Sequence, residues 1–148
     1  MAANEALPRG ESFWIAAPIA ANSGVGPNSG DPLVWGNAGS PSKSVALVAM
    51  TSYTPPGSLT ATGNISVKRI GAYFLSVAAK SSINPGSGVA IKPGDAVYAD
   101  GGTMDTTTGI LYGFTINVNS TTGWFYGHAM DAISSGQTAT IRVLIGAK

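Results

Sequence analysis

The sequence predicts an all-β fold: a compact antiparallel β-sandwich or barrel, jelly-roll-like, of about eight or nine short strands. Short apolar runs, several of them alternating with period two, recur along the chain, as in half-buried strands. Twenty glycines and nine prolines in 148 residues separate these runs. No stretch has the apolar spacing of a capped helix of three turns. A hydrophobic content of 44% and a net charge of +1 exclude a disordered chain.

Each expected strand is an apolar run that ends at a turn sequence. In chain order the runs are residues 33–35, 44–50, 63–67, 72–78, 88–91, 96–98, 110–118, 124–130 and 138–145. In the turns between them, glycine supplies positive φ and proline presets a corner. Gly30-Asp31 and Gly94-Asp95 share one pattern, which we interpret as two turns that enter core strands rather than as a duplication.

The first thirty residues differ from the rest of the chain. They contain Pro8, Pro18 and Pro27, which disfavour a long helix. They also carry Phe13 and Trp14, and burying a large side chain contributes about 1.5–3 kcal/mol. We therefore expect an extended N-terminal arm over residues 1–30, covered by another surface, and a β-domain over residues 31–148.

Charge and composition exclude several classes of protein. The eight cations are scattered, with Lys68-Arg69 the only adjacent basic pair, so nucleic acid is not an expected partner. No apolar run reaches the roughly 18 residues that span a bilayer, so no membrane partner is expected. Without cysteine, neither a disulfide nor a thiolate metal site can form. Charged residues at the start of the chain argue against a secretion signal.

The ionisable residues form no recognisable catalytic pattern. His128 is the only histidine and lies inside an expected strand, where a structural role is favoured over general-base or metal chemistry. Asp100 and Asp105 flank a glycine-rich loop, which is compatible with a calcium site but fits a hairpin better. Asp95 follows Pro93-Gly94, where an Asx-turn is expected. We expect no enzyme activity, cofactor or metal.

The aromatic run Trp124-Phe125-Tyr126 has two interpretations. It is compatible with a sugar-binding platform of the kind found in β-sandwich lectins, or with a core or subunit interface. Strand neighbours point to opposite faces, so Trp124 and Tyr126 share one face and Phe125 takes the other. A strand that is apolar on both faces is covered on both sides, which favours the core or interface.

The order of several segments resembles a family of capsid decoration, or cement, proteins of tailed bacteriophages. The segments are Gly30-Asp31-Pro32-Leu33-Val34, Ser44-Val45-Ala46-Leu47, residues 65–77, residues 91–98, Gly127-His128-Ala129-Met130 and Ile141-Arg142-Val143-Leu144. The family pattern has a Gly-x-Phe-x-Leu-x-Val strand, a Gly-Asp-x-Val-Tyr element and a terminal Val-x-Leu strand. This chain departs from the first pattern, because two residues, Ala72 and Tyr73, lie between Gly71 and Phe74 where the family has one.

The resemblance implies a compact β-domain bound, as a homotrimer, to the major capsid protein on the outer surface of an icosahedral head, at three-fold and quasi-three-fold positions. The protein would be made in the host cytoplasm and end in the virion. The residues that we expect to contact the shell or another subunit are all large and apolar: Phe13, Trp14, Ile15, Trp35, Trp124 and Tyr126. The alternative is a carbohydrate-binding β-sandwich module of a phage or bacterial adhesin.

Overall fold

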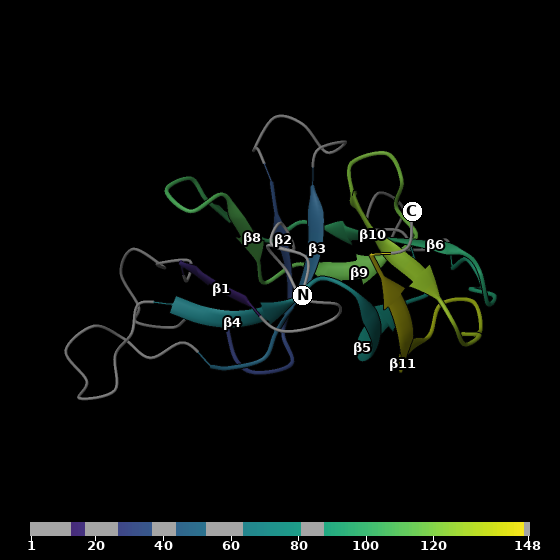
Figure 1. Ribbon diagram of the computed structural model, residues 1–148. Coiled ribbons are helices and arrows are strands. Elements are labelled where there is room, and N and C mark those ends of the chain that lie inside the picture. Colours follow the sequence, from purple (N-terminus) through teal and green to yellow (C-terminus); the bar gives the residue numbers. More distant parts are fainter. Residues whose placement is uncertain (1–12, 17–26, 37–43, 53–63, 81–87, 147–148) are drawn as a thin grey trace.

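The structure is a computed structural model that describes residues 13–16, 27–36, 44–52, 64–80 and 88–146 (Figure 1). As the sequence predicts, the regular elements in these ranges are strands, and none of these residues forms a helix long and apolar enough to cross a membrane. The strands are β1 (Phe13–Ala16), β2 (Pro32–Trp35), β3 (Val45–Ala49), β4 (Asn64–Lys68), β5 (Gly71–Ala78), β6 (Ala96–Asp100), β7 (Thr103–Asp105), β8 (Ile110–Tyr112), β9 (Thr115–Asn117), β10 (Trp124–Ala129) and β11 (Thr138–Ile145).

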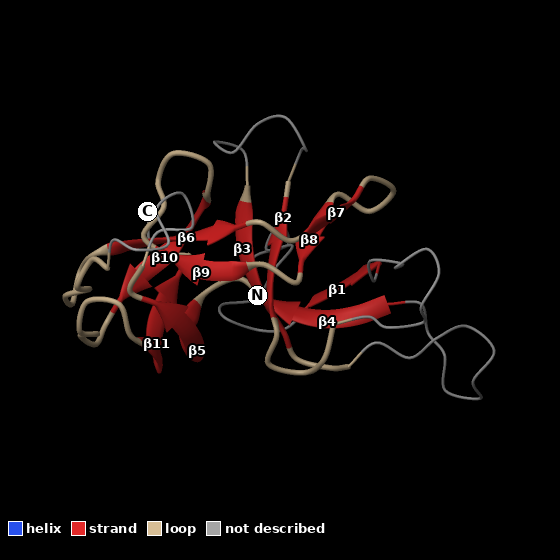
Figure 2. Cartoon of the chain, turned by 180° about the vertical axis from the view of Figure 1, so that it is seen from behind, coloured by secondary structure: helices blue, strands red, loops and turns tan. Residues whose placement is uncertain are grey.

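The strands form an open sheet and a closed barrel that lie beside each other (Figure 2). The open sheet has the order β1-β4-β3-β2-β8-β7, and the barrel has the order β10-β11-β5-β9-β6. The pairs are antiparallel, except that β5 and β9 run parallel where Val77 meets Ile116. The all-β class and the barrel are therefore confirmed, and the molecule adds a separate sheet to the barrel.

The open sheet buries apolar side chains on both faces. Val34 and Val48 belong to the same core cluster as the inward residues of the barrel, so this face packs against the barrel. Their strand neighbours Leu33 and Leu47 point the other way and form a second cluster, whose further members are Ala49, Ile65, Val67 and Ile110. Continuous apolar runs such as Leu33-Val34 are typical of strands covered on both sides.

Besides this apolar packing, a buried hydroxyl links the barrel to the open sheet. The side chain of Tyr126, on β10, is completely buried, and its hydroxyl donates a 2.6 Å hydrogen bond to the carbonyl oxygen of Leu47 on β3. Burial disfavours the charged phenolate and raises the pKa of Tyr126 well above its usual value. This hydrogen bond holds β10 of the barrel against the backbone of β3 in the open sheet.

The two turns that share a sequence pattern also share a structure. Gly30 and Gly94 have φ values of 93° and 96°, a region that glycine adopts without strain. The carboxylates of Asp31 and Asp95 each accept a 2.8 Å hydrogen bond from the backbone amide three residues earlier. The turns lead into β2 and β6, as predicted. Asp95 accepts a local backbone amide, as expected, but from Lys92, three residues earlier, and not from a following residue as in an Asx-turn.

One expected strand is in fact two. The predicted run 110–118 breaks into β8 in the open sheet and β9 in the barrel. Gly113, with φ of 66°, lies at the break, and the ring of Phe114 turns toward Tyr126 with centroids 5.7 Å apart. The apolar alternation continues through this point because residues on both sides are buried, in different cores. Ile110 packs in the second cluster and Ile116 in the barrel.

Two further local predictions were wrong. The Gly101-Gly102 segment is not a hairpin: it carries the chain from β6 in the barrel to β7, a short strand that we did not predict, in the open sheet. Both glycines have positive φ, 74° and 84°. The run 88–91 forms only isolated bridges, Lys80 with Gly88 and Ile91 with Ile133.

The expected arm is described in two pieces: residues 13–16 are extended, and residues 27–30 belong to the turn before β2. Its residues 13–16 form β1, which pairs with β4 in a register that sets Phe13 opposite Val67 and Ala16 opposite Asn64. The arm segment thus adds a strand to one edge of the open sheet. Residues 1–12 and 17–26 of the predicted arm lie outside the described residues.

Candidate functional site

The carboxylate of Asp100 accepts hydrogen bonds from three described side chains. Its Oδ2 accepts hydrogen bonds from the side-chain amides of Asn117 (3.0 Å) and Asn119 (3.1 Å), and its Oδ1 accepts one from the hydroxyl of Thr122 (3.2 Å). The amide oxygens accept backbone N–H groups, which fixes the NH₂ groups toward the carboxylate. Donors rather than oxygens therefore surround Asp100, an arrangement that holds a loop in place and does not suit a cation.

The other described carboxylates also have structural partners. Asp105 accepts the backbone amides of Thr107 and Thr108 in the β7–β8 turn. Asp131 and Arg142 form a bidentate ion pair, with Arg142 Nη2 2.6 Å and Nε 3.1 Å from the carboxylate oxygens. These hydrogen bonds lower the pKa of Asp131 to about 2. Among the described residues, no group of three or more histidines and acids is placed to hold a metal ion.

His128 lies on the outer side of the barrel and takes part in aromatic packing. Its ring meets the ring of Phe125 edge to face, with centroids 5.2 Å apart. Phe125 in turn meets Tyr98 in a T-shaped pair at 6.1 Å. The structural role that we favoured for His128 agrees with these contacts.

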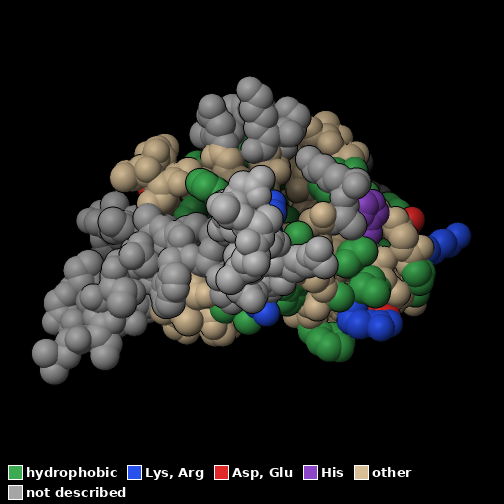
Figure 3. Space-filling model, viewed as in Figure 1, with side chains coloured by type: hydrophobic (Ala, Val, Ile, Leu, Met, Phe, Trp, Pro, Cys, Tyr) green, Lys and Arg blue, Asp and Glu red, His purple; other side chains and the backbone are tan. Residues whose placement is uncertain are grey.

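A mainly apolar surface, which also contains His128 and borders Arg142, lies on the outside of the barrel over β5, β11 and β10. The register places Ala72 beside Leu144, Leu144 beside His128, and Phe74 beside Arg142. We call the surface formed by Ala72, Phe74, Phe125, His128 and Leu144 the outer barrel face. Figure 3 shows hydrophobic side chains gathered near the histidine on this side of the molecule. Phe74 is its most prominent member, with 75% of its surface exposed.

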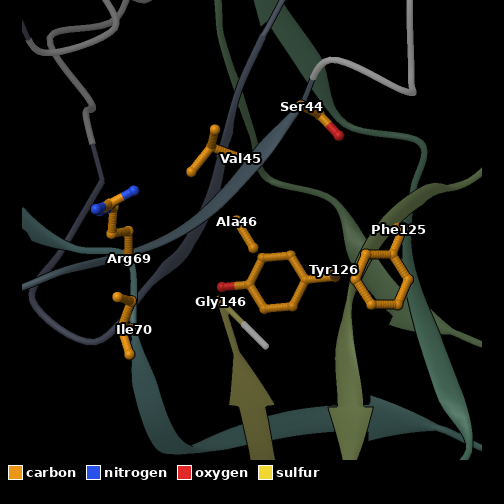
Figure 4. A pocket seen from close by; sticks show the side chains of 8 residues that line it. All are labelled: Ser44, Val45, Ala46, Arg69, Ile70, Phe125, Tyr126 and Gly146. Carbon is orange, nitrogen blue, oxygen red and sulfur yellow. The ribbon is translucent and has the colours of Figure 1, made fainter. Parts of the chain in front are cut away.

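A pocket of about 200 Å³ opens where the barrel meets the open sheet. It is lined by Ser44, Val45, Ala46, Arg69, Ile70, Phe125, Tyr126 and Gly146, which we call the junction pocket. Arg69 and Ile70, from the β4–β5 turn, lie on one side and Phe125 on the other, with Ala46 and the Tyr126 ring between them (Figure 4). Because Phe125 belongs to both, the pocket is continuous with the outer barrel face.

The walls of the junction pocket are mainly apolar, and their polar groups are the side chains of Ser44 and Arg69 and the phenol of Tyr126. Val45 and Ile70 are 37% and 44% exposed, so the pocket rim presents apolar surface to solvent. Arg69 is exposed, and no described residue forms an ion pair or hydrogen bond with its side chain. Gly146 is required at the floor: it has φ of 77°, and an added Cβ would collide with the carbonyl oxygen of Arg69.

The six predicted contact residues differ in their position and exposure. Trp35 is 46% exposed at the end of β2, where a partner can reach it. Tyr126 is completely buried, and its ring forms part of the lining of the junction pocket. Phe13, Trp14 and Ile15 lie in the edge strand β1.

Trp124 is half-buried and packs against the barrel core, where a Cβ at Gly36 would lie 3.2 Å from its ring. Trp124 and Tyr126 thus both face the interior while Phe125 faces outward, as the alternation predicts. A β-bulge between Phe125 and Gly127 interrupts the pairing of β10 with β6 at this point. This packing supports the core interpretation over an open sugar-binding platform.

Phe74, Ile70 and Arg69 were not among the predicted contact residues. A signal for Phe74 was present, because the alternation that turns Tyr73, Leu75 and Val77 inward turns Phe74 outward. The junction pocket had no such signal, since it joins residues from segments up to about a hundred positions apart.

Comparisons of the chain with protein-family models, with curated proteins and with solved structures find no match.

Proposed function

We propose that this protein is a capsid decoration protein of a tailed bacteriophage. It binds as a trimer to the outer surface of the head, at three-fold and quasi-three-fold positions, and stabilises the shell of the major capsid protein. Two features support the proposal. The order of sequence segments resembles that family, and the all-β fold is the class that the resemblance implies. Such a protein acts by covering surface and needs no reactive groups.

The observation that carries the proposal is the exposure of Phe74. This residue lies on β5, which is paired on both sides, by β11 and β9, so its position is set by the barrel. Phe74 is 75% exposed and is not a member of the buried core, and the outer barrel face also contains the apolar residues Ala72 and Leu144, with Arg142 directly across from Phe74. A large apolar side chain exposed on a rigid strand, next to further apolar residues, is typical of an interaction site.

The experiment measures attachment to heads. Heads of the phage that encodes the chain are produced without it, the purified protein is added, and occupancy is quantified by cryo-electron microscopy and by gel densitometry. We expect saturable binding at three-fold positions and a higher temperature of head disruption. Phe74→Ser is expected to weaken binding about tenfold or more, as for a central apolar contact.

Val89→Ser is the matched control, because Val89 is 48% exposed and lies outside the outer barrel face. It should bind as the unmodified protein does. Heads that take up no protein would overturn the proposal. Equal losses in Phe74→Ser and Val89→Ser would overturn the assignment of the surface, and selective binding to a glycan array would favour the adhesin alternative.

A further inference from the structure

The junction pocket has the size of an anchor site rather than of a cofactor site. Its volume is about 200 Å³, whereas small-molecule and cofactor sites are typically about 300–1,000 Å³. Pockets that receive one side chain of a partner are small, apolar and central to an interface, and their occupants are often aromatic. The apolar walls formed by Ala46, Ile70 and Phe125 meet that description.

The charge at the pocket defines a second property of its occupant. Arg69 is the only ionisable group in the lining besides the phenol of Tyr126, which is already hydrogen-bonded to Leu47. No aspartate or glutamate lies within four residues in sequence of any lining residue. The sole ion pair among the described residues, Asp131–Arg142, uses a different cation. An exposed guanidinium beside an apolar hollow is complementary to a carboxylate next to a bulky side chain.

We infer that the junction pocket is an anchor site for an acidic segment of the partner protein, which inserts one bulky apolar side chain and places a carboxylate beside Arg69. The inference rests on the proposed function, with a protein of the shell as the partner. It adds the chemistry that the shell surface must present: an aromatic or large aliphatic residue next to aspartate or glutamate. The outer barrel face lies beside the anchor, because Phe125 borders both.

The test uses blocked tripeptides, so that it is independent of heads. The ¹⁵N-labelled protein is titrated with Ac-Asp-Phe-Asp-NH₂, Ac-Asp-Ala-Asp-NH₂ and Ac-Lys-Phe-Lys-NH₂. We expect the first peptide to cause saturable shifts of the backbone amides of Ala46, Ile70 and Gly146, with a dissociation constant on the order of 1 mM. The alanine and lysine peptides should each bind about tenfold or more weakly.

Variants of the protein separate charge from volume. Arg69→Glu should weaken the acidic peptide about tenfold and strengthen the lysine peptide. Lys80→Glu, which makes the same charge change at an exposed site outside the pocket, should leave the preference for the acidic peptide in place. Ala46→Leu should prevent binding of both phenylalanine-containing peptides, because the larger side chain fills the pocket. Because Arg69 has no ion pair among the described residues, Arg69→Glu is expected to fold, and Arg69→Gln provides a milder second test.

Absence of saturable shifts at the pocket, or equal binding of the three peptides, would overturn the inference. Head binding is measured separately with the same variants. If the peptides bind as expected and the heads do not bind the protein, the anchor chemistry stands and the decoration function fails. If heads bind the protein, and Arg69→Glu and Ala46→Leu bind as well as Lys80→Glu, the decoration function stands and the anchor fails.

Discussion

Replacing Tyr126 by phenylalanine should destabilise the fold by a defined amount. The change keeps the ring, so the packing in the barrel core is retained, and it removes the 2.6 Å hydrogen bond to the Leu47 carbonyl oxygen. A hydrogen bond contributes about 0.5–1.5 kcal/mol net, and removing one partner of a buried hydrogen bond can cost up to about 3 kcal/mol. We therefore expect the free energy of unfolding to fall by about 1–2 kcal/mol. For 148 residues, that corresponds to a decrease in Tm of roughly 2–8 °C.

The assay is urea denaturation followed by tryptophan fluorescence and far-UV circular dichroism. Tyr98→Phe is the matched control, because the Tyr98 hydroxyl has no hydrogen-bond partner among the described residues, and it should change stability by less than about 0.5 kcal/mol. Equal stabilities of Tyr126→Phe and Tyr98→Phe would refute the idea that this hydroxyl ties the barrel to the sheet.

The same residue predicts a loss of stability at alkaline pH. Burial raises the pKa of Tyr126 in the folded protein above its unfolded value. Its contribution is therefore fully present below pH 10 and is lost as the pH rises further, because only the unfolded chain releases the proton. The slope is at most about 1.4 kcal/mol per pH unit. Tyr126→Phe should remove this part of the slope between pH 10 and 11.5, and an identical pH dependence in both proteins would contradict the assignment.

Three further predictions concern local features. Gly101→Ala and Gly102→Ala both place alanine at positive φ, but a Cβ at Gly102 would lie 2.6 Å from a backbone carbonyl oxygen and one at Gly101 has nothing within 4 Å. Gly102→Ala should be the more destabilising by about 1 kcal/mol or more in urea denaturation, and equal effects would argue against the close approach. The pKa of Asp131, about 2 in the ion pair, should return toward 3.8 in Arg142→Gln when followed by NMR. In the unmodified protein the stabilising effect of this pair should be complete above pH 3.8 and disappear as the pH falls to about 2; an unchanged titration would contradict the pair. Calcium at about 5 mM should leave Tm unchanged, since the donors around Asp100 disfavour a cation, and a rise in Tm would show a site.

The alternation of apolar and polar residues was sufficient to predict strands that have one face in a core and the other face in solvent. Residues 72–78 and 138–145 are of this kind, and they match β5 and β11 closely. Alternation failed at Gly113, because the residues before it and after it are buried in different cores. Which sheet a strand joins depends on long-range pairing, and a local pattern does not contain that information.

The candidate site was predictable only in part. The outward orientation of Phe74 follows from the alternation of its own strand, so the sequence alone is sufficient to predict that this side chain is exposed. The pocket, in contrast, brings together Ala46, Arg69, Phe125 and Gly146 from four separate segments. Their proximity follows from the pairing of β10 with β11 and of β11 with β5, together with the packing of β3 against the barrel. The sequence alone shows Arg69 only as a member of the basic pair Lys68-Arg69 and does not place it beside a pocket.

The position of the junction pocket connects binding with stability. Its lining comes from the open sheet through Val45 and Ala46 and from the barrel through Phe125 and Gly146, and Tyr126 forms the bond between the two. An occupant that contacts both elements binds only while they are packed together, so binding must raise the free energy of separating them. The partner gains a fixed point of attachment by the same contacts. Under the function that we propose, with a shell protein as the partner, a side chain held at this junction would stabilise the fold of this protein and its attachment to the shell together.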